Sequence, residues 1–251
     1  MTLMTNKQLF DEISVQDSVA GGYNNIRYKK KYSEAYQRKW FFDMIHLINN
    51  KGLVLDNGCG VGYLASMFPV GSIIGFDISM GMLGQARSRI DDLVRGNSQE
   101  LPFPDETFDV IVCRSLLHHL PKPEKGITEM NRVLKNGGEV IFAEPIASFI
   151  SYFPRKLQNE EHFSEVHKDF KRKDILSLIE SEFTIEHIHH FGYIAYPVLG
   201  FPDIVDPLKK MPFQDAIADI LVTADNIIAE IPIINRQSWG IMIKARKRSP
   251  S

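Results

Sequence analysis

The segment VLDNGCGVG, residues 54–62, constrains the fold of this chain more than any other part of its sequence. A short apolar run at 53–55 ends at Asp56, and glycines then occupy alternate positions. Glycines in this arrangement let the backbone turn sharply and approach a ligand with no Cβ in the way. The pattern predicts a buried parallel strand that ends in a tight, ligand-binding turn.

Strands and helices are predicted to alternate after this turn. Strands are expected at 72–77, 92–95, 108–113, 139–144 and 238–245. Helices are expected at 33–49, after the capping residue Ser79, from Pro123 to the glycines at 137–138, and at 174–180. Such alternation predicts a parallel sheet that is covered by helices on both faces.

Two later segments depart from this regular alternation. Residues 183–196 alternate in polarity, which predicts one long strand with Phe183, Ile185, His187, His189 and Phe191 on a single face. An insert at 197–237 has apolar residues at helical spacing in its middle, which predicts an amphipathic helix with a wide apolar stripe.

Composition limits the classes of partner. The 251 residues carry a net charge of -2, so no general attraction to nucleic acid or to an anionic membrane is expected. The two cysteines form no metal or disulfide pattern, which indicates a reduced, cytoplasmic protein. Neither a signal peptide nor an apolar run long enough to span a bilayer is recognisable, and peripheral membrane contact stays open.

The negative charge of Asp56, beside the glycine turn, helps to distinguish between two classes of ligand. Glycine spacing alone admits a nicotinamide dinucleotide, because counting from Gly60 satisfies that motif. Asp56 would repel a pyrophosphate at this place, whereas it would attract the ammonium and sulfonium groups of S-adenosylmethionine (SAM). Asp77, at the end of the second strand, suits the ribose of either cofactor. Asp56 therefore favours SAM.

The ordered motifs VLDNGCGVG, GFDIS, GNSQELPFPDETFDVIVC, SLLHHL and VLKNGGEVIFAEP resemble those of class I SAM-dependent methyltransferases. They are most similar to the small-molecule branch that includes the quinone-biosynthesis enzymes. The resemblance covers about Tyr23 to Glu144. It implies a methyltransferase that converts SAM to S-adenosyl-L-homocysteine (SAH).

The resemblance also implies an architecture. A Rossmann-like α/β sheet of seven mostly parallel strands is expected, in the order 3-2-1-4-5-7-6, with the seventh strand antiparallel and helices on both faces. Residues 1–50 would form an N-terminal cap segment and the first helix, and residues 51–251 the SAM-binding core. The helical insert at 197–237, before the last strand, would form a lid.

Cofactor contacts follow from the same resemblance. Asp56 and the glycine turn would hold the methionine part of SAM, Asp77 the ribose, and Tyr23 would lie over the cofactor. Asn97 stands where the family has aspartate at the adenine edge, and Arg114 and Ser115 would approach through their backbone. The implied set is Tyr23, Asp56, Gly58, Cys59, Gly60, Gly62, Asp77, Ile78, Met82, Asn97, Ser98, Arg114, Ser115 and His119.

Methyl transfer needs alignment of the reactants, and it needs a base only when the acceptor carries a proton that it does not lose by itself. Candidate bases are His167 and Glu144, after and at the end of the fifth strand, and His119 after the fourth. The histidines at 187, 189 and 190 have no metal-ligand spacing, and no metal site is expected.

The acceptor is expected to be a small or lipid-like molecule, because the charge is low and the insert is apolar. Methylation at oxygen is expected, because a histidine or carboxylate base near the fifth strand would suit a hydroxyl. Nitrogen and carbon acceptors, a macromolecular acceptor and a non-catalytic SAM-binding protein are the alternatives. The chain is expected to act as a monomer or a homodimer.

Overall fold

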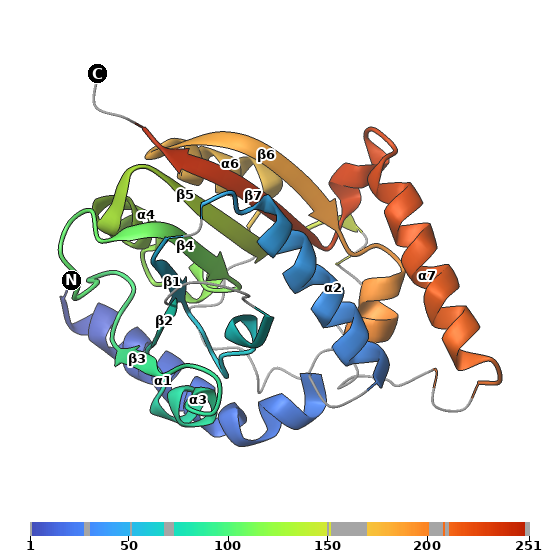
Figure 1. Cartoon of the computed structure of the whole chain (residues 1–251), viewed down its shortest axis with the longest axis horizontal. Helices are drawn as coiled ribbons and strands as arrows, with labels where there is room; N and C mark the ends of the chain where they lie inside the picture. Colours follow the sequence, from blue (N-terminus) through green and yellow to red (C-terminus); the bar gives the residue numbers. More distant parts are fainter. Residues whose placement is uncertain are drawn as a thin grey trace.

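One seven-stranded sheet organises the computed structural model, which describes residues 2–27, 31–50, 52–67, 73–149, 151, 170–200, 208 and 211–248 (Figure 1). The strands are β1 (Val54–Asn57), β2 (Ile73–Asp77), β3 (Asp92–Arg95), β4 (Phe108–Arg114), β5 (Leu134–Pro145), β6 (Phe183–Phe191) and β7 (Gly240–Lys247). Their order is β3-β2-β1-β4-β5-β7-β6, and β7 runs antiparallel to both of its neighbours. The expected strand order is confirmed.

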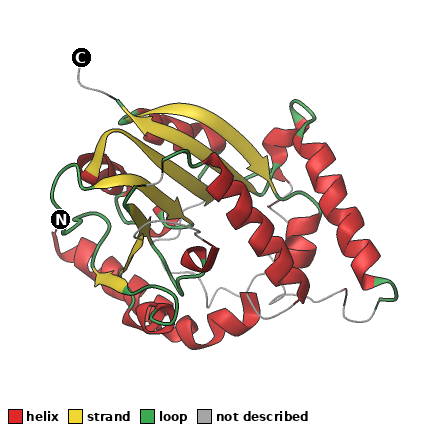
Figure 2. Ribbon diagram, viewed as in Figure 1, coloured by secondary structure: helices red, strands yellow, loops and turns green. Residues whose placement is uncertain are grey.

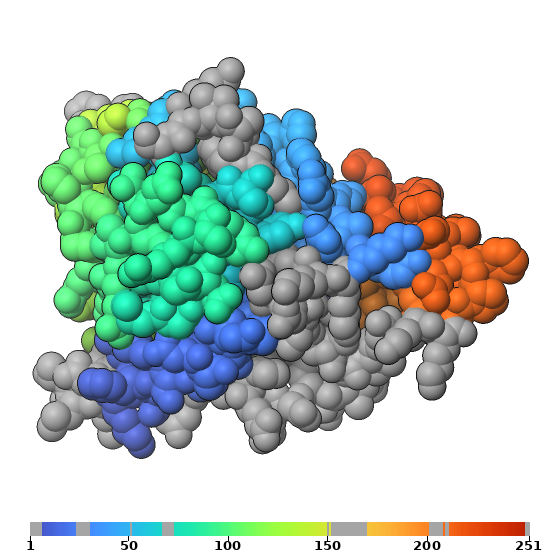
Figure 3. Space-filling view, turned by 60° about the horizontal axis from the view of Figure 1, so that its bottom comes forward, coloured from blue at the N-terminus to red at the C-terminus, as the bar shows by residue number. Residues whose placement is uncertain are grey.

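Helices cover both faces of the sheet (Figure 2). On one face lie α4 (Pro123–Val133) and α6 (Arg172–Glu180), and on the other lie α2 (Lys31–Leu47) and, beyond it, α7 (Gln214–Ala229). Short helices are η1 (Leu64–Met67), η2 (Leu117–His119), η4 (Tyr196–Gly200) and η6 (Ile234–Gln237). The N-terminal α1 (Thr2–Arg27) packs along α3 (Met80–Ala86), as the space-filling view also shows (Figure 3).

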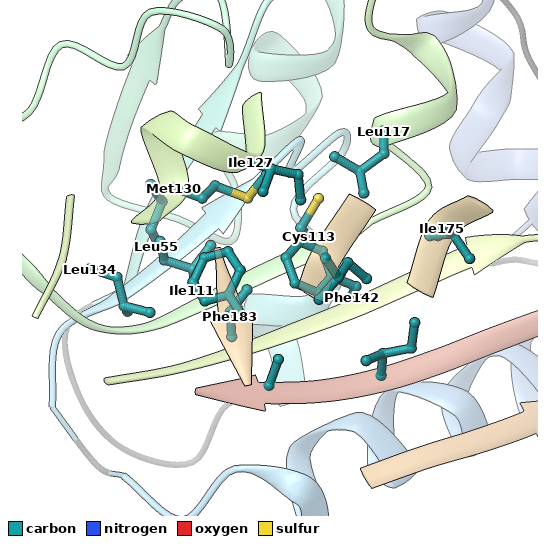
Figure 4. Close-up of a cluster of buried hydrophobic side chains, with 14 of the residues drawn as sticks. Leu55, Ile111, Cys113, Leu117, Ile127, Met130, Leu134, Phe142, Ile175 and Phe183 are labelled. Atoms are coloured by element: carbon teal, nitrogen blue, oxygen red, sulfur yellow. The ribbon is translucent and has the colours of Figure 1, made fainter. Parts of the chain in front are cut away.

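The larger core fills the α4 and α6 face of the sheet (Figure 4). Strand residues of alternate positions, such as Ile111 and Cys113, point to this face because side chains alternate along a strand. Ile127 and Met130 meet them from α4, where a spacing of three places both residues on one side of the helix. All four side chains are fully buried, so this layer fixes α4 against the centre of the sheet.

The start of β5 differs from the prediction. The strand begins at Leu134, directly after α4, and the glycines expected to stop the helix lie inside it. Leu134 pairs with Phe108, and the register then shifts before Val110. Gly137 has φ of +70°, which glycine adopts without strain, so the irregular strand start depends on it.

The long alternating strand was also predicted incorrectly. β6 ends at Phe191, and its register shifts between Ile185 and His187. The shift reverses the alternation, so that Ile185 and Ile188 face the larger core while His187 is exposed. Phe191 packs on the opposite face, against Trp40 of α2. A single added residue of this kind cannot be read from alternation.

The expected insert helix is α7, and it is fixed by a buried carboxylate. Asp225 accepts hydrogen bonds from three consecutive backbone N–H groups, those of residues 193–195, at 2.7–3.0 Å, and from the Tyr36 hydroxyl of α2. The opposite side of the helix is apolar and exposed at Ile220 and Ile227, and Phe213, directly before the helix, is exposed too. No helix among the described residues is both long and apolar enough to cross a membrane.

Replacing Asp225 should destabilise the fold. The substitution Asp225→Ala leaves buried N–H groups without an acceptor, and we expect it to lower the free energy of unfolding by about 2 to 4 kcal/mol. Urea denaturation measures the change. Asp219→Ala, at an exposed position of the same helix, is the control and should change it by less than about 0.5 kcal/mol. Equal effects of the two substitutions would contradict the anchoring role.

Candidate functional site

Polar side chains gather where the parallel strands β1, β2, β4 and β5 end. Asp56 lies near the end of β1, Asp77 ends β2, Arg114 ends β4 and Glu144 lies near the end of β5. The carboxyl ends of neighbouring parallel strands meet at one edge, so these charged groups share one side of the molecule.

The glycine turn closes over β2. The N–H groups of Gly58 and Cys59 both donate to the carbonyl oxygen of Phe76, and the N–H of Gly60 donates to Asp77 Oδ2 at 2.9 Å. Gly58, Gly60 and Gly62 all have positive φ. A Cβ built on Gly60 would meet no atom of the described residues within 4 Å apart from its chain neighbours, so these residues leave space beside the backbone at this point.

The buried carboxylate of Asp56 does not have a hydrogen-bond partner for each of its oxygens within the described residues. Its side chain is 3% exposed, and within the described residues its Oδ2 has no hydrogen-bond partner. Burial raises the pKa of Asp56 to about 7, although the nearby Arg114 guanidinium lowers it. A buried anion with an unused oxygen is a site for a cationic or hydrogen-bond-donating ligand.

Asp77 is engaged by its own backbone surroundings. Its carboxylate accepts from the N–H groups of Gly60 and Ser79, at 2.9 Å each. Burial raises the pKa of Asp77, and these hydrogen bonds act against that shift. Ser79 in turn caps α3, because its Oγ accepts from the Met82 N–H. Asp77 therefore ties the glycine turn to the start of α3.

The residues expected at the adenine edge have local partners. Ser98 is buried and donates to the Asn57 side chain at 2.7 Å, and the Asn97 amide oxygen accepts from the backbone of Gln99. Ile78 is half-buried after β2, whereas Met82 is buried in α3. The structure therefore places all of these residues around the ends of β2 and β3.

The loop after β4 carries the next expected contacts. Ser115 is exposed, has φ of +50°, and donates its N–H to the carbonyl oxygen of Ala143. Leu116 and Leu117 donate their N–H groups to Glu144 Oε1, both at 2.8 Å. Glu144 thus fixes the path of this loop from the neighbouring strand.

The candidate bases differ in their burial and in their hydrogen-bond partners. Glu144 is fully buried, bonds to His118 through its other oxygen, and has its pKa raised to about 7 by burial. His119 keeps about a fifth of its side chain exposed, and its Nδ1 lies 3.1 Å from Glu12 of α1. His167 lies outside the described residues. These contacts favour a positioning role for Glu144.

Helix α1 contributes residues that the sequence analysis missed. Glu12 is buried against His119 and the side-chain amide of Gln16. Asp17 accepts from the Gly81 N–H and the Ser79 hydroxyl at the start of α3. Tyr23, half-buried, packs against the cluster on the α2 face of the sheet. Acidic side chains are favoured near a helix N-terminus, but the sequence does not show that Asp17 faces the start of α3.

The raised pKa of Asp56 predicts a pH dependence of stability. The folded state keeps the proton of Asp56 up to about pH 7, whereas the unfolded state loses it near pH 3.8, so burial costs stability as the pH rises between these values. Asp56→Asn removes this cost. We expect its stability advantage over the wild-type protein to grow between pH 4 and pH 8 by up to about 4 kcal/mol.

Urea denaturation at several pH values measures this difference, and the titration of Glu144 cancels because both proteins contain it. Asp219→Asn, at an exposed position, is the matched control and should run parallel to the wild type. A constant difference between Asp56→Asn and wild type would contradict the raised pKa.

Known proteins match the part of the chain that supplies most of this edge of the sheet. Residues 55–142 match the family described as "Methyltransferase domain". A demethylmenaquinone methyltransferase of Symbiobacterium thermophilum is 37% identical over 39% of this chain and 46% of its own. A phosphatidylethanolamine N-methyltransferase of Cereibacter sphaeroides is 33% identical over 47% of this chain and 61% of its own. The chain spans about half the length of the relatives it matches.

Solved structures share the whole architecture. A SAM-dependent methyltransferase of Thermotoga maritima has a TM-score of 0.65 and 19% identity, over 94% of this chain and 100% of that one. The N-methyltransferase NodS of Bradyrhizobium japonicum, in complex with SAH, has a TM-score of 0.60 and 12% identity, over 94% and 98%. These likenesses show the fold, and the matched motifs add the family. Residues 55–142 of this chain therefore form a methyltransferase domain of the class I, SAM-dependent type.

Proposed function

We propose that this chain binds SAM at the glycine turn and transfers its methyl group to oxygen of a small or lipid-like molecule. The observation that carries the proposal is the buried Asp56 carboxylate, whose Oδ2 has no partner among the described residues, beside the open space at Gly60. A nicotinamide dinucleotide would bring a pyrophosphate toward the same carboxylate, which repels it.

The residues at the sheet edge fit the chemical groups of SAM. Asp56 would accept the ammonium of the methionine part, which supplies the missing hydrogen-bond donor. Asp77 would hold the ribose, since each carboxylate oxygen has two lone pairs and can accept a hydroxyl beside the N–H groups that it already binds. Gly60 leaves room for close approach of the ligand to the backbone.

When bound, SAM supplies a methyl group on a cationic sulfur atom. The chain's own task is to orient the acceptor, exclude water and receive a proton from a hydroxyl acceptor. His119 is the best-supported base among the described candidates, because it is partly exposed at the cofactor edge and Glu12 lies at its Nδ1. Glu144 would act through His118 and the loop after β4. His167 remains a candidate.

Two segments would cover the site and exclude water. The N-terminal segment 1–50 brings α1 against α3, where Asp17 contacts Gly81. The insert 197–237 brings α7 against α2 through Asp225. The first precedes the 51–251 core, and the second is inserted into that core before β7, which supports their proposed role as a cap and a lid.

Three observations support an apolar small-molecule acceptor. Two relatives are named for demethylmenaquinone and phosphatidylethanolamine as acceptors, and both molecules are largely apolar. Helix α7 of the insert exposes Ile220 and Ile227, and Phe213, directly before this helix, is exposed as well. The net charge of -2 offers no surface for tracking phosphates along a nucleic acid.

The cofactor assignment predicts measurable binding of SAH. Isothermal titration calorimetry of the purified chain should detect it, and Asp77→Asn should weaken the affinity about tenfold or more, because the amide turns a donor toward the ribose hydroxyls. Asp92→Asn, exposed on β3, is the matched control and should leave it unchanged. No binding of SAH by the wild-type chain, with retention of a nicotinamide dinucleotide instead, would refute the assignment.

The acceptor proposal predicts the outcome of a screen with methyl-labelled SAM. Label should enter phenols, quinols or lipid hydroxyls. His119→Asn should lower the rate for a hydroxyl acceptor, and this loss should shrink at high pH, where the acceptor gives up its proton without a base. Mass spectrometry identifies the methylated atom. Label found only in tRNA or protein would overturn the acceptor class, and SAH binding without any turnover would favour the non-catalytic alternative.

A further inference from the structure

The side chain of Arg114 shares a face of the sheet with Asp56. In the parallel pairing of β1 with β4, Asp56 lies beside Val112. Residues two apart on a strand point to the same face, so Arg114 follows Val112 onto the side that Asp56 occupies. This is the α2 face, where Val112 packs with Phe41 of α2.

Packing holds the Arg114 guanidinium near this edge. Its central carbon lies 4.8 Å from the centre of the Phe41 ring, and Phe41 itself is 2% exposed. A planar cation on a fixed aromatic face is restricted in its orientation. Arg114 is half-buried, so it is neither a freely solvated surface charge nor a fully enclosed one.

The Arg114 guanidinium interacts electrostatically with the Asp56 carboxylate, which is proposed to bind the cofactor. Arg114 lowers the pKa of Asp56 and so opposes the upward shift that burial causes. A cation and an anion on adjacent strands form a pair that complements a zwitterion. The methionine end of SAM is such a zwitterion, with its ammonium and its carboxylate on the same carbon atom.

We propose that the Arg114 side chain binds the carboxylate of the methionine part of SAM while Asp56 binds the ammonium. This inference rests on the proposed function, and it goes beyond the backbone contact that the family resemblance implies for Arg114. Bonds from a guanidinium to a carboxylate are charge-assisted and directional, so Arg114 would select donors that keep the amino-acid end.

Three ligands separate the groups at this end. SAH has both the ammonium and the carboxylate, S-adenosyl-3-thiopropylamine keeps only the ammonium, and 5′-methylthioadenosine has neither. Calorimetry should show that Arg114→Gln weakens SAH binding about ten- to a hundredfold and leaves the other two affinities unchanged. Asp56→Asn should weaken SAH and S-adenosyl-3-thiopropylamine and spare 5′-methylthioadenosine. Arg114→Lys should restore part of the affinity for SAH.

Controls keep the result interpretable. Arg87→Gln, at an exposed arginine after α3, should bind all three ligands like the wild type. Unchanged affinity of Arg114→Gln for 5′-methylthioadenosine shows that its site is folded. If Arg114→Gln weakens all three ligands alike, its role is structural and the inference is refuted.

The alternative source of a carboxylate is the acceptor molecule. If Arg114→Gln binds SAH as tightly as the wild type, the inference is overturned. This holds even if the variant has a higher KM for an anionic acceptor. If the wild-type chain itself binds no SAH, the proposed function fails instead. The two failures are therefore distinguished by the wild-type titration.

Discussion

The parallel pairing of β1 with both β2 and β4 is the constraint on which the rest of the molecule depends. All four residues of β1 are buried, and hydrogen bonds to strands on either side leave them no freedom of register. Parallel strands all end at one edge, so the pairing brings Asp56, Asp77 and Arg114 together from distant parts of the sequence. The chain then leaves β1 through the glycine turn, whose N–H groups bond to the end of β2.

Burying several carboxylates at one edge is costly, and the chain treats each of them differently. Asp77 and Glu144 accept backbone N–H groups, which fix the glycine turn and the loop after β4. Asp56 has no hydrogen-bond partner for its Oδ2 within the described residues, and its pKa is raised to about 7. Two carboxylates therefore organise the protein, and we propose that the third receives a ligand that brings its own positive charge.

Sequence reasoning reached the features that depend on local pattern. The apolar runs predict most of the strands, Ser79 predicts the cap of α3, and the motif order predicts the sheet. Helix α1 escaped because its apolar residues follow no helical period, so its contacts through Glu12 and Asp17 exist only in the folded chain. The irregularity in β6 escaped because one added residue reverses a face without leaving a signal in composition.

Helix α2 contacts both Arg114 at the proposed SAM site and Asp225 of the insert. Phe41 of this helix carries the Arg114 guanidinium at the cofactor edge, and Tyr36, from the same helix, donates its hydroxyl to Asp225 of α7. Burial raises the pKa of Tyr36 well above its usual range, so the hydroxyl keeps its proton and remains a donor. Asp225 also holds the turn at residues 193–195. A single helix thus forms a wall of the cofactor edge and the support of the insert, which gives the proposed lid a fixed base.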